Sequence, residues 1–260
     1  KKEIELLKIK PKLTVVLVGD DPASKVYVKN KEKFAGIVGI DSEIIRLPET
    51  TTEGELLTLV ERLNNDKSVH GILVQFPVPK HISQEKIMNT ISPEKDVDGL
   101  TPVNIGRLVS GSAYLSPCTP TGIIRMIKRT GIDIKGKNAV VVGRSLLVGK
   151  PVAIMLLREN ATVTICHSKT TDIAAQISRA DIVVAAVGIP NFVTGNMIKE
   201  GAVVIDVGIN QVEEKLIGDV EFESAAKKAS YITPVPGGVG PMTIAMLLEN
   251  TLTACRQQTQ

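Results

Sequence analysis

From residue 13 the sequence reads Leu13-Thr14-Val15-Val16-Leu17-Val18-Gly19-Asp20-Asp21-Pro22-Ala23-Ser24-Lys25-Val26-Tyr27-Val28-Lys29-Asn30-Lys31 and continues to Val38. An apolar run ending in glycine, a polar turn with proline and a segment of helical spacing predict a buried strand, a turn and a helix. A strand at residues 41–47, an amphipathic helix at 51–63 that Thr52 can cap, and a buried strand at 69–74 follow. This alternation predicts a parallel sheet with right-handed crossovers.

One face of the first predicted helix carries an unexpected charge. Three- and four-residue steps place on it Ser24, Tyr27, Lys31, Phe34 and Val38. We expect this face to point inward because Phe34 and Val38 belong to it, which puts the Lys31 ammonium on the apolar side. In one interpretation the lysine stem packs and its head reaches water. In the other, Lys31 lies in a cleft, where partial desolvation lowers its pKa and lets it move protons.

Polar residues follow the predicted strands. Ligands of open parallel sheets collect at the carboxyl ends of the strands. Asp20, Asp21 and Ser24 come just beyond the first strand, and Gln75 comes just beyond the third. These side chains can therefore face each other across a cleft.

Prolines interrupt the pattern between residues 76 and 120, apart from a helix-like piece at 83–91. Within this region Asp96-Val97-Asp98-Gly99 places two carboxylates at alternate positions beside a glycine. Without other observations a solvated turn is the favoured interpretation. The alternative is a hydrogen-bond acceptor for a ligand.

A second alternation begins after a helical segment at 121–129. Strands are predicted at 138–143, 161–166, 181–186 and 202–207, with helices at 151–158 and 171–179. This is a doubly wound nucleotide-binding pattern. The chain closes with a glycine-rich loop at 234–241 and an apolar helix from about residue 242 to 255.

The turn Gly143-Arg144-Ser145-Leu146-Leu147-Val148-Gly149-Lys150-Pro151 joins strand to helix in this second half. Gly143 permits a tight turn, and Gly149 precedes a helix start whose free N–H groups favour phosphate. The spacing differs from the usual fingerprint, because Gly143, Ser145 and Val148 occupy the three glycine positions. The strand–turn–helix context nevertheless predicts dinucleotide binding rather than a purely structural turn.

The preferred dinucleotide can be predicted from the second strand. An NAD site places a carboxylate after that strand, to hold the ribose hydroxyls. Here the strand ends in Cys166-His167-Ser168-Lys169-Thr170 without a carboxylate, and Arg144 projects toward the same place. A guanidinium with hydroxyl and cationic neighbours suits a 2′-phosphate, so the sequence predicts NADP.

Composition narrows the class of protein. Among 260 residues, 43% are hydrophobic and 23% charged, which is typical of a globular protein, and the length favours two domains. Aromatic residues are only 3%, Trp is absent and no basic cluster carries stacking residues, so we expect no nucleic-acid partner. We also expect no membrane association, because no apolar run is long enough to span a bilayer.

The cysteines and histidines are few and far apart in the sequence. They are Cys118, Cys166, Cys255, His70, His81 and His167. Scattered cysteines argue against a disulfide framework or a zinc site and for a reducing compartment, so we expect a cytoplasmic protein. Scattered histidines predict no histidine-ligated metal.

Six ordered motifs together carry a family resemblance. They are Asp21-Pro22-Ala23-Ser24 with Tyr27-Val28 and Lys31; His70-Gly71-Ile72-Leu73-Val74-Gln75-Phe76-Pro77; Lys95-Asp96-Val97-Asp98-Gly99; Pro117-Cys118-Thr119-Pro120; Gly143-Arg144-Ser145 with Val148-Gly149-Lys150-Pro151; and Pro234-Val235-Pro236-Gly237-Gly238-Val239-Gly240-Pro241-Met242-Thr243. Over nearly its whole length the chain closely resembles the bifunctional methylenetetrahydrofolate dehydrogenase/cyclohydrolases. It departs at the start, where residues 1–10 look like the end of a longer N-terminal segment.

The resemblance implies two reaction steps at one cleft. A hydride leaves the methylene bridge of 5,10-methylenetetrahydrofolate for the nicotinamide of NADP, and water then opens the methenyl cation to 10-formyltetrahydrofolate. Lys31 matches the family's catalytic lysine, and Gln75 matches a glutamine hydrogen-bonded near it. Tyr27 matches a residue that lies against the folate ring. Asp98 matches the carboxylate that takes the paired N–H donors of the pterin.

The same resemblance completes the implied site and architecture. Further substrate-binding residues are Ser24, Gly237, Gly238 and Pro241. The cofactor-binding residues are Gly143, Arg144, Ser145, Val148, Gly149, His167, Ser168, Gly188 and Ile209. Two α/β domains with a cleft between them are implied: residues 1–119 plus 243–260 for folate and catalysis, and a Rossmann-type NADP-binding domain at 120–242. A homodimer is expected as well.

Three other interpretations stay open at this stage. A two-domain dehydrogenase of amino-acid type can share the architecture. A cofactor-sensing or scaffold protein can use the same nucleotide-binding fold without catalysis. A member of the family can also retain only one of its two activities.

Overall fold

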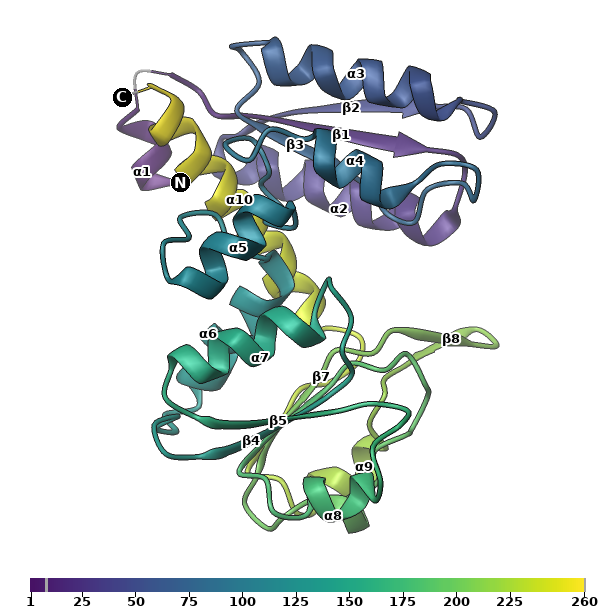
Figure 1. Cartoon of the computed structure of the whole chain (residues 1–260), viewed down its shortest axis with the longest axis vertical. Coiled ribbons are helices and arrows are strands. Elements are labelled where there is room, and N and C mark those ends of the chain that lie inside the picture. Colours follow the sequence, from purple (N-terminus) through teal and green to yellow (C-terminus); the bar gives the residue numbers. More distant parts are fainter. Residues whose placement is uncertain (8, 260) are drawn as a thin grey trace. The chain divides into compact units, whose positions relative to one another are not determined.

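The computed structural model describes residues 1–7 and 9–259. The chain forms two compact units, Lys1–Cys118 with Ile244–Gln260, and Thr119–Thr243. Residue 8, in the predicted N-terminal segment 1–10, and residue 260, at the end of the predicted range 243–260, lie outside the described residues. Figure 1 follows the chain through both units.

The first unit is built on a three-stranded parallel sheet. Its strands are β1 (Lys12–Val18), β2 (Asp41–Leu47) and β3 (Gly71–Val74), in the order β2-β1-β3. Val15 pairs with Ile44 on one side and with Leu73 on the other. The predicted parallel sheet is therefore confirmed, and β1 is central because its apolar residues are buried on both faces.

Helices cover this sheet and extend from it. They are α1 (Lys2–Glu5), α2 (Pro22–Val38), α3 (Glu53–Asn65), α4 (Gln84–Thr90), α5 (Pro102–Ser110) and the part of α10 (Val239–Thr259) from Ile244 onward. Figure 1 shows α2 and α3 on opposite faces of the sheet. Thr52 caps α3 through a reciprocal capping box with Glu55, as the sequence indicates. The apolar stripe of α3, Leu56, Leu59, Val60 and Leu63, is buried.

The inward face of α2 differs from the predicted one. Among the residues of this helix whose burial the structure describes, Ser24, Val28, Lys31 and Ala35 are buried, whereas Phe34 is 41% exposed. The stripe that contacts the sheet is centred on Val28 and Ala35, and Phe34 lies about 100° around the helix from Ala35. The prediction was correct for Lys31 and wrong for Phe34, because small side chains form the contact.

The second unit contains a five-stranded parallel sheet. Its strands are β4 (Asn138–Val142), β5 (Thr162–Cys166), β6 (Ile182–Ala185), β7 (Val203–Asp206) and β10 (Tyr231–Ile232), in the order β10-β7-β6-β4-β5. The order reverses between β4 and β6, which is where doubly wound sheets bind ligands. Helices α6 (Cys118–Arg129), α7 (Gly149–Arg158), α8 (Ile173–Ile177) and α9 (Phe222–Ala226) and the 3₁₀ helix η1 (Gly195–Met197) complete the unit. In Figure 1, α7 lies on one face of the sheet and α8 on the other.

Several elements were not predicted. Helix α5, strand β10 and the hairpin of β8 (Asn210–Val212) and β9 (Lys215–Ile217) escaped the sequence patterns. The two hairpin strands are mostly exposed, so no apolar alternation marks them. Helix α7 begins two residues before Pro151 and α10 begins at Val239, each directly after a glycine-rich turn. Within the described part of the chain, no helix has the length and apolarity needed to cross a membrane.

Candidate active site

The first candidate group surrounds Lys31 in the first unit. This lysine is only 8% exposed, and its Nζ donates a hydrogen bond to Gln75 Oε1 at 2.8 Å. Gln75 follows the last residue of β3, and its Nε2 donates to the Phe76 carbonyl at 2.7 Å, which leaves Oε1 turned toward Lys31. The interpretation that the lysine head reaches water is therefore wrong. The neutral amide holds the amine without adding a charge.

Electrostatics link Lys31 to Asp98. Burial lowers the pKa of Lys31, while the negative charge of Asp98 acts in the opposite direction. Burial raises the pKa of Asp98, and the charge of Lys31 partly offsets that rise. The two groups therefore form a coupled pair. The pKa shift of each one favours its uncharged form.

Two other predicted residues share helix α2 with Lys31. Ser24 is buried, and its N–H donates to Asp21 Oδ2 at 2.7 Å, which caps the helix. Tyr27 is half-buried, and burial raises its pKa, so its hydroxyl stays protonated. Helical spacing places both near the face that carries Lys31.

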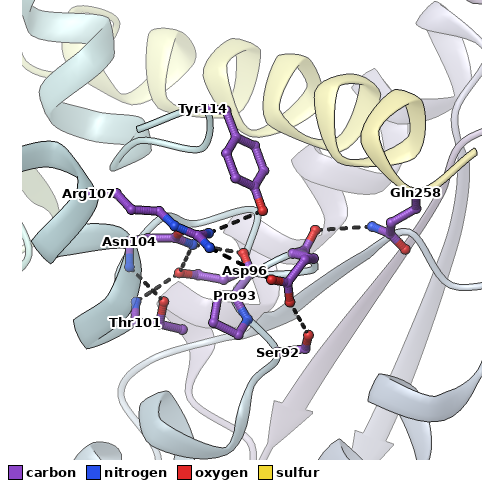
Figure 2. Close-up of polar contacts among 9 residues, drawn as sticks. Ser92, Pro93, Asp96, Thr101, Asn104, Arg107, Tyr114 and Gln258 are labelled. Carbon is purple, nitrogen blue, oxygen red and sulfur yellow. Dashed lines mark hydrogen bonds and ion pairs between the residues drawn. The ribbon is translucent and has the colours of Figure 1, made fainter. Parts of the chain in front are cut away.

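The turn that carries Asp98 is held by its buried neighbour Asp96. Asp96 is 2% exposed and accepts hydrogen bonds from the N–H groups of Gly99 at 2.9 Å and Thr101 at 2.8 Å, and from Asn104 Nδ2 at 2.9 Å. Figure 2 shows Asp96 between Thr101 and Asn104. The solvated-turn interpretation is wrong for Asp96, because its carboxylate organises the turn from inside.

A wider polar network supports the same turn (Figure 2). Arg107 Nη1 donates to Asn104 Oδ1 and to the Tyr114 hydroxyl, both at 3.2 Å. Gln258 of α10 donates to the Glu94 carbonyl at 3.0 Å. These contacts tie α5 and the C-terminal helix to the segment before Asp98.

Two further residues around Asp98 were missed as site residues. Asn250 Nδ2 donates to the carbonyls of Val97 at 2.9 Å and Ser116 at 2.8 Å. Cys118 Sγ donates to the Val97 carbonyl at 3.1 Å, and burial beside Asp98 raises the pKa of its thiol well above the usual value. The family motif contains Cys118 and could have indicated it, whereas nothing in the local sequence marks Asn250.

The second candidate group is the turn after β4 in the second unit. Gly143 has a φ of +121°, and a β-carbon there would overlap the Ala186 carbonyl oxygen, so only glycine fits. Ser145 Oγ accepts the N–H groups of Val148 at 3.1 Å and Gly149 at 3.3 Å. The turn therefore brings exposed backbone and the start of α7 to the point where the strand order reverses.

The predicted 2′-phosphate residues lie at neighbouring strand ends. The Gly143 N–H donates to the Cys166 carbonyl at 2.9 Å, so Arg144 and the residues after β5 leave the sheet side by side. Arg144 and Ser168 are exposed and His167 is half-buried. His167 Nδ1 accepts the Lys169 N–H at 3.1 Å, which leaves Nε2 for a ligand.

The other predicted residues of this unit lie on three loops. Gly188 follows β6 with a φ of +68°, and Ile209 follows β7 and is 48% exposed. Gly237 and Gly238 directly precede α10, and Pro241 is exposed in its first turn. Gly237 has a φ of +102°, which favours glycine.

Comparison with known proteins identifies the family. The catalytic-domain model of tetrahydrofolate dehydrogenase/cyclohydrolase matches residues 1–98, and the NAD(P)-binding-domain model of the same family matches residues 117–259. The chain belongs to the tetrahydrofolate dehydrogenase/cyclohydrolase family.

Relatives of this family match nearly end to end. "Bifunctional protein FolD" of Moorella thermoacetica is 61% identical over 99% of this chain and 93% of its own length. The crystal structure of the bifunctional FolD enzyme from Campylobacter jejuni has a TM-score of 0.95 and 49% identity, over 98% of this chain and 92% of that one. The structure of the Trypanosoma brucei enzyme, solved with NADP cofactor and inhibitor, has a TM-score of 0.96 and 41% identity. The match covers 100% of this chain and 93% of that one.

For a member of the tetrahydrofolate dehydrogenase/cyclohydrolase family, the geometry offers two kinds of chemistry. The Lys31–Gln75 pair provides an amine with a lowered pKa, suited to moving protons. The Gly143 turn provides backbone donors suited to phosphate. Among residues 1–7 and 9–259, no group of three or more His, Cys, Asp or Glu side chains is placed to hold a metal ion.

Proposed function

We propose that this protein is a bifunctional one-carbon folate enzyme. It oxidises 5,10-methylenetetrahydrofolate to 5,10-methenyltetrahydrofolate with NADP and then hydrolyses the product to 10-formyltetrahydrofolate. The observation that carries the proposal is the buried Lys31 amine held by a neutral amide, in a chain whose two halves match the two domains of this family. A lysine with a lowered pKa has a direct use in the hydrolytic step.

The oxidative step needs positioning more than proton transfer. Loss of hydride from a carbon between two nitrogens gives a delocalised cation directly, so no strong base is required. NADP, when bound, supplies the hydride acceptor. The residues that would hold it are Gly143, Arg144, Ser145, Val148, Gly149, His167, Ser168, Gly188 and Ile209. Arg144, His167 and Ser168 suit the 2′-phosphate, and the start of α7 suits the pyrophosphate.

The hydrolytic step needs proton transfers, and we assign them to Lys31. Its neutral amine can accept a proton from the attacking water and return it to the departing ring nitrogen. Gln75 keeps the amine in place without a charge that would restore the ordinary lysine pKa. Lys31 therefore acts in the hydrolysis that follows the oxidation.

The remaining substrate residues bind and orient the folate. Asp98 accepts the paired N–H donors of the pterin, in a charge-assisted double hydrogen bond. Tyr27 lies against the ring, and Ser24 contributes from the same helix. Gly237, Gly238 and Pro241 offer backbone that a ligand can approach closely. The first unit is accordingly the folate-binding domain, and the second is the NADP-binding domain.

A single assay tests this function. Purified protein is mixed with 5,10-methylenetetrahydrofolate and NADP, and absorbance is followed for reduced cofactor and for the methenyl compound. We expect both signals, with the methenyl signal decaying as 10-formyltetrahydrofolate forms. Turnover of an amino or keto acid without any folate reaction would favour a dehydrogenase of amino-acid type instead. NADP binding without a folate-dependent absorbance change would favour a cofactor sensor.

We also infer a homodimer in the cytoplasm. Strand β2 forms an edge of its sheet, and a groove beside it is lined by apolar Ile45 and Leu47 and by residues of α3 such as the exposed Thr58. A second copy can cover this edge. Light scattering of the purified protein should give twice the chain mass, and Thr58→Arg should shift the measured mass toward that of the monomer.

The cytoplasmic location is supported by cysteine usage. The three buried free cysteines suit a reducing compartment.

A further inference from the structure

Two buried carboxylates in the second unit lie outside the sites described above. Asp206, the last residue of β7, is 3% exposed, and Asp219 is 0% exposed. Among the described residues, neither carboxylate forms an ion pair with a Lys or Arg side chain. Their charges are balanced instead by backbone N–H groups, an arrangement that binds anions in proteins. We call this pair the two-aspartate clamp.

Asp219 holds the loop that follows β6. Its Oδ2 accepts the N–H groups of Val187 at 2.6 Å and Gly188 at 2.9 Å, and its Oδ1 accepts the N–H of Ile189 at 3.0 Å. Oδ1 also accepts Asn210 Nδ2 at 2.9 Å, from the first residue of β8. One carboxylate therefore joins the loop after β6 to the start of β8, beyond the carboxyl ends of the strands, where the cofactor is expected.

Asp206 holds Asp219 in place. Its Oδ1 accepts the N–H groups of Gly208 at 3.0 Å and Asp219 at 2.9 Å, and its Oδ2 accepts the N–H of Val220 at 2.9 Å. Burial raises the pKa of Asp206, and these N–H donors oppose that rise. Glycine at positions 208 and 218 makes the approach possible, because a β-carbon at either would overlap a carboxylate oxygen.

The clamp turns three consecutive N–H groups away from solvent and leaves the opposite side of the loop exposed. Ile189, whose N–H Asp219 holds, is 50% exposed, and Ile209 after β7 is 48% exposed. Loss of the carboxylate would leave three N–H groups that face the buried Asp219 without a partner, and the loop would have to move to hydrate them. The conformation of Gly188 and Ile189 therefore depends on a residue about thirty positions later in the chain.

We propose that Asp219 is a positioning residue for NADP, acting through the Gly188 and Ile189 backbone. The inference rests on the proposed function, since it concerns the NADP site. Asp219 does not touch the cofactor in this assignment. It sets the shape of the loop against which the cofactor lies, and so it acts on oxidation and not on hydrolysis.

The test compares Asp219→Asn and Asp219→Ala with a matched control, Asp181→Ala. Asp181 also accepts a backbone N–H, that of Asn138 at 2.9 Å, but at the amino ends of the strands, opposite to the ends where the cofactor is expected. NADP affinity is measured by calorimetry, and hydrolysis is measured on methenyltetrahydrofolate with no NADP present. We expect NADP affinity to fall about 10- to 100-fold in both Asp219 variants, and the KM for NADP to rise by a similar factor. Hydrolysis should stay within about twofold, and Asp181→Ala should keep wild-type NADP affinity.

Other outcomes overturn the proposal. Unchanged NADP affinity in Asp219→Ala would remove the positioning role. A parallel fall of both activities with the melting temperature would assign the clamp to stability alone, as would failure of both Asp219 variants to fold. Failure of the proposed function is distinguishable, because wild-type protein would then lack the folate reactions before any variant is compared. In that case, calorimetry with NADP still decides whether Asp219 positions the cofactor.

Discussion

The Lys31 group and the Gly143 turn perform their proposed tasks by different means. The first uses side chains whose pKa values are displaced by burial and by each other, as Lys31 and Asp98 show. The second uses backbone, with glycine required at Gly143 and a serine hydroxyl that closes the turn. Proton transfer needs a group that titrates, whereas holding a cofactor for hydride transfer needs shape. Substitutions in the two regions should therefore separate the two activities.

The largest expected effect is on hydrolysis in Lys31→Met. Removing the amine takes away the proton carrier, so the hydrolytic rate should fall by about 10²- to 10⁴-fold while folate binding persists. Methenyltetrahydrofolate decay, followed by absorbance, measures it. Lys29→Met is the control, since Lys29 is exposed on the same helix. Full hydrolysis by Lys31→Met would exclude Lys31 from the mechanism.

Gly143→Ala should produce the opposite separation. The added β-carbon would overlap the Ala186 carbonyl oxygen, and the φ of +121° disfavours any side chain. We expect NADP-dependent oxidation to fall about 100-fold with hydrolysis retained, measured in separate assays. Gly136→Ala is a matched control, because its φ is also positive and nothing lies within 4 Å of an added β-carbon. Equal losses in the two variants would point to backbone strain alone.

Asp98→Asn should affect both steps. Loss of the charged acceptor should raise the folate KM about tenfold, because charge-assisted hydrogen bonds are the stronger ones. The Asp98 charge raises the pKa of Lys31, so its removal should lower that pKa. If the neutral amine is the active form, the rising limb of the hydrolysis pH profile then moves to lower pH. A limb that stays in place would uncouple the two groups.

Arg144→Ala should act on one cofactor only. Losing the guanidinium removes a charge-assisted contact with the 2′-phosphate, so the KM for NADP should rise about tenfold while that for NAD stays unchanged. Steady-state kinetics with each dinucleotide measures the difference, with Arg158→Ala of α7 as an exposed control. An equal rise for both dinucleotides would place Arg144 away from the 2′-phosphate.

The smallest effect concerns stability. Because burial lowers the pKa of Lys31 below 10.5 in the folded state, the unfolded chain binds the proton more tightly. Lys31→Met should therefore stabilise the protein by about 1 kcal/mol near neutral pH. This gain should shrink as pH rises through the window between the lowered pKa and 10.5. Urea unfolding at several pH values measures it, and a constant gain would contradict the linkage.

The sequence alone determined strands β1 to β7, the main helices and the presence of a nucleotide turn. These depend on local periodicity and on caps such as Thr52, which act within a few residues. It also identified Lys31 as unusual, since helical spacing set it on an inward stripe. The site residues implied by the family resemblance remain predictions that the variants above test.

Tertiary structure alone decided which buried polar groups find partners. Asp96, Asn250 and Asp219 bind backbone atoms that are distant in sequence or hidden by a turn, and no periodicity marks such pairs. The same holds for Phe34, which is exposed because the sheet accepts Ala35 and Val28 instead. Local pattern sets where an element begins and which sides are apolar. The partners of a buried donor or charge are set only when separate segments pack together, because each such group must then be satisfied by whatever lies beside it.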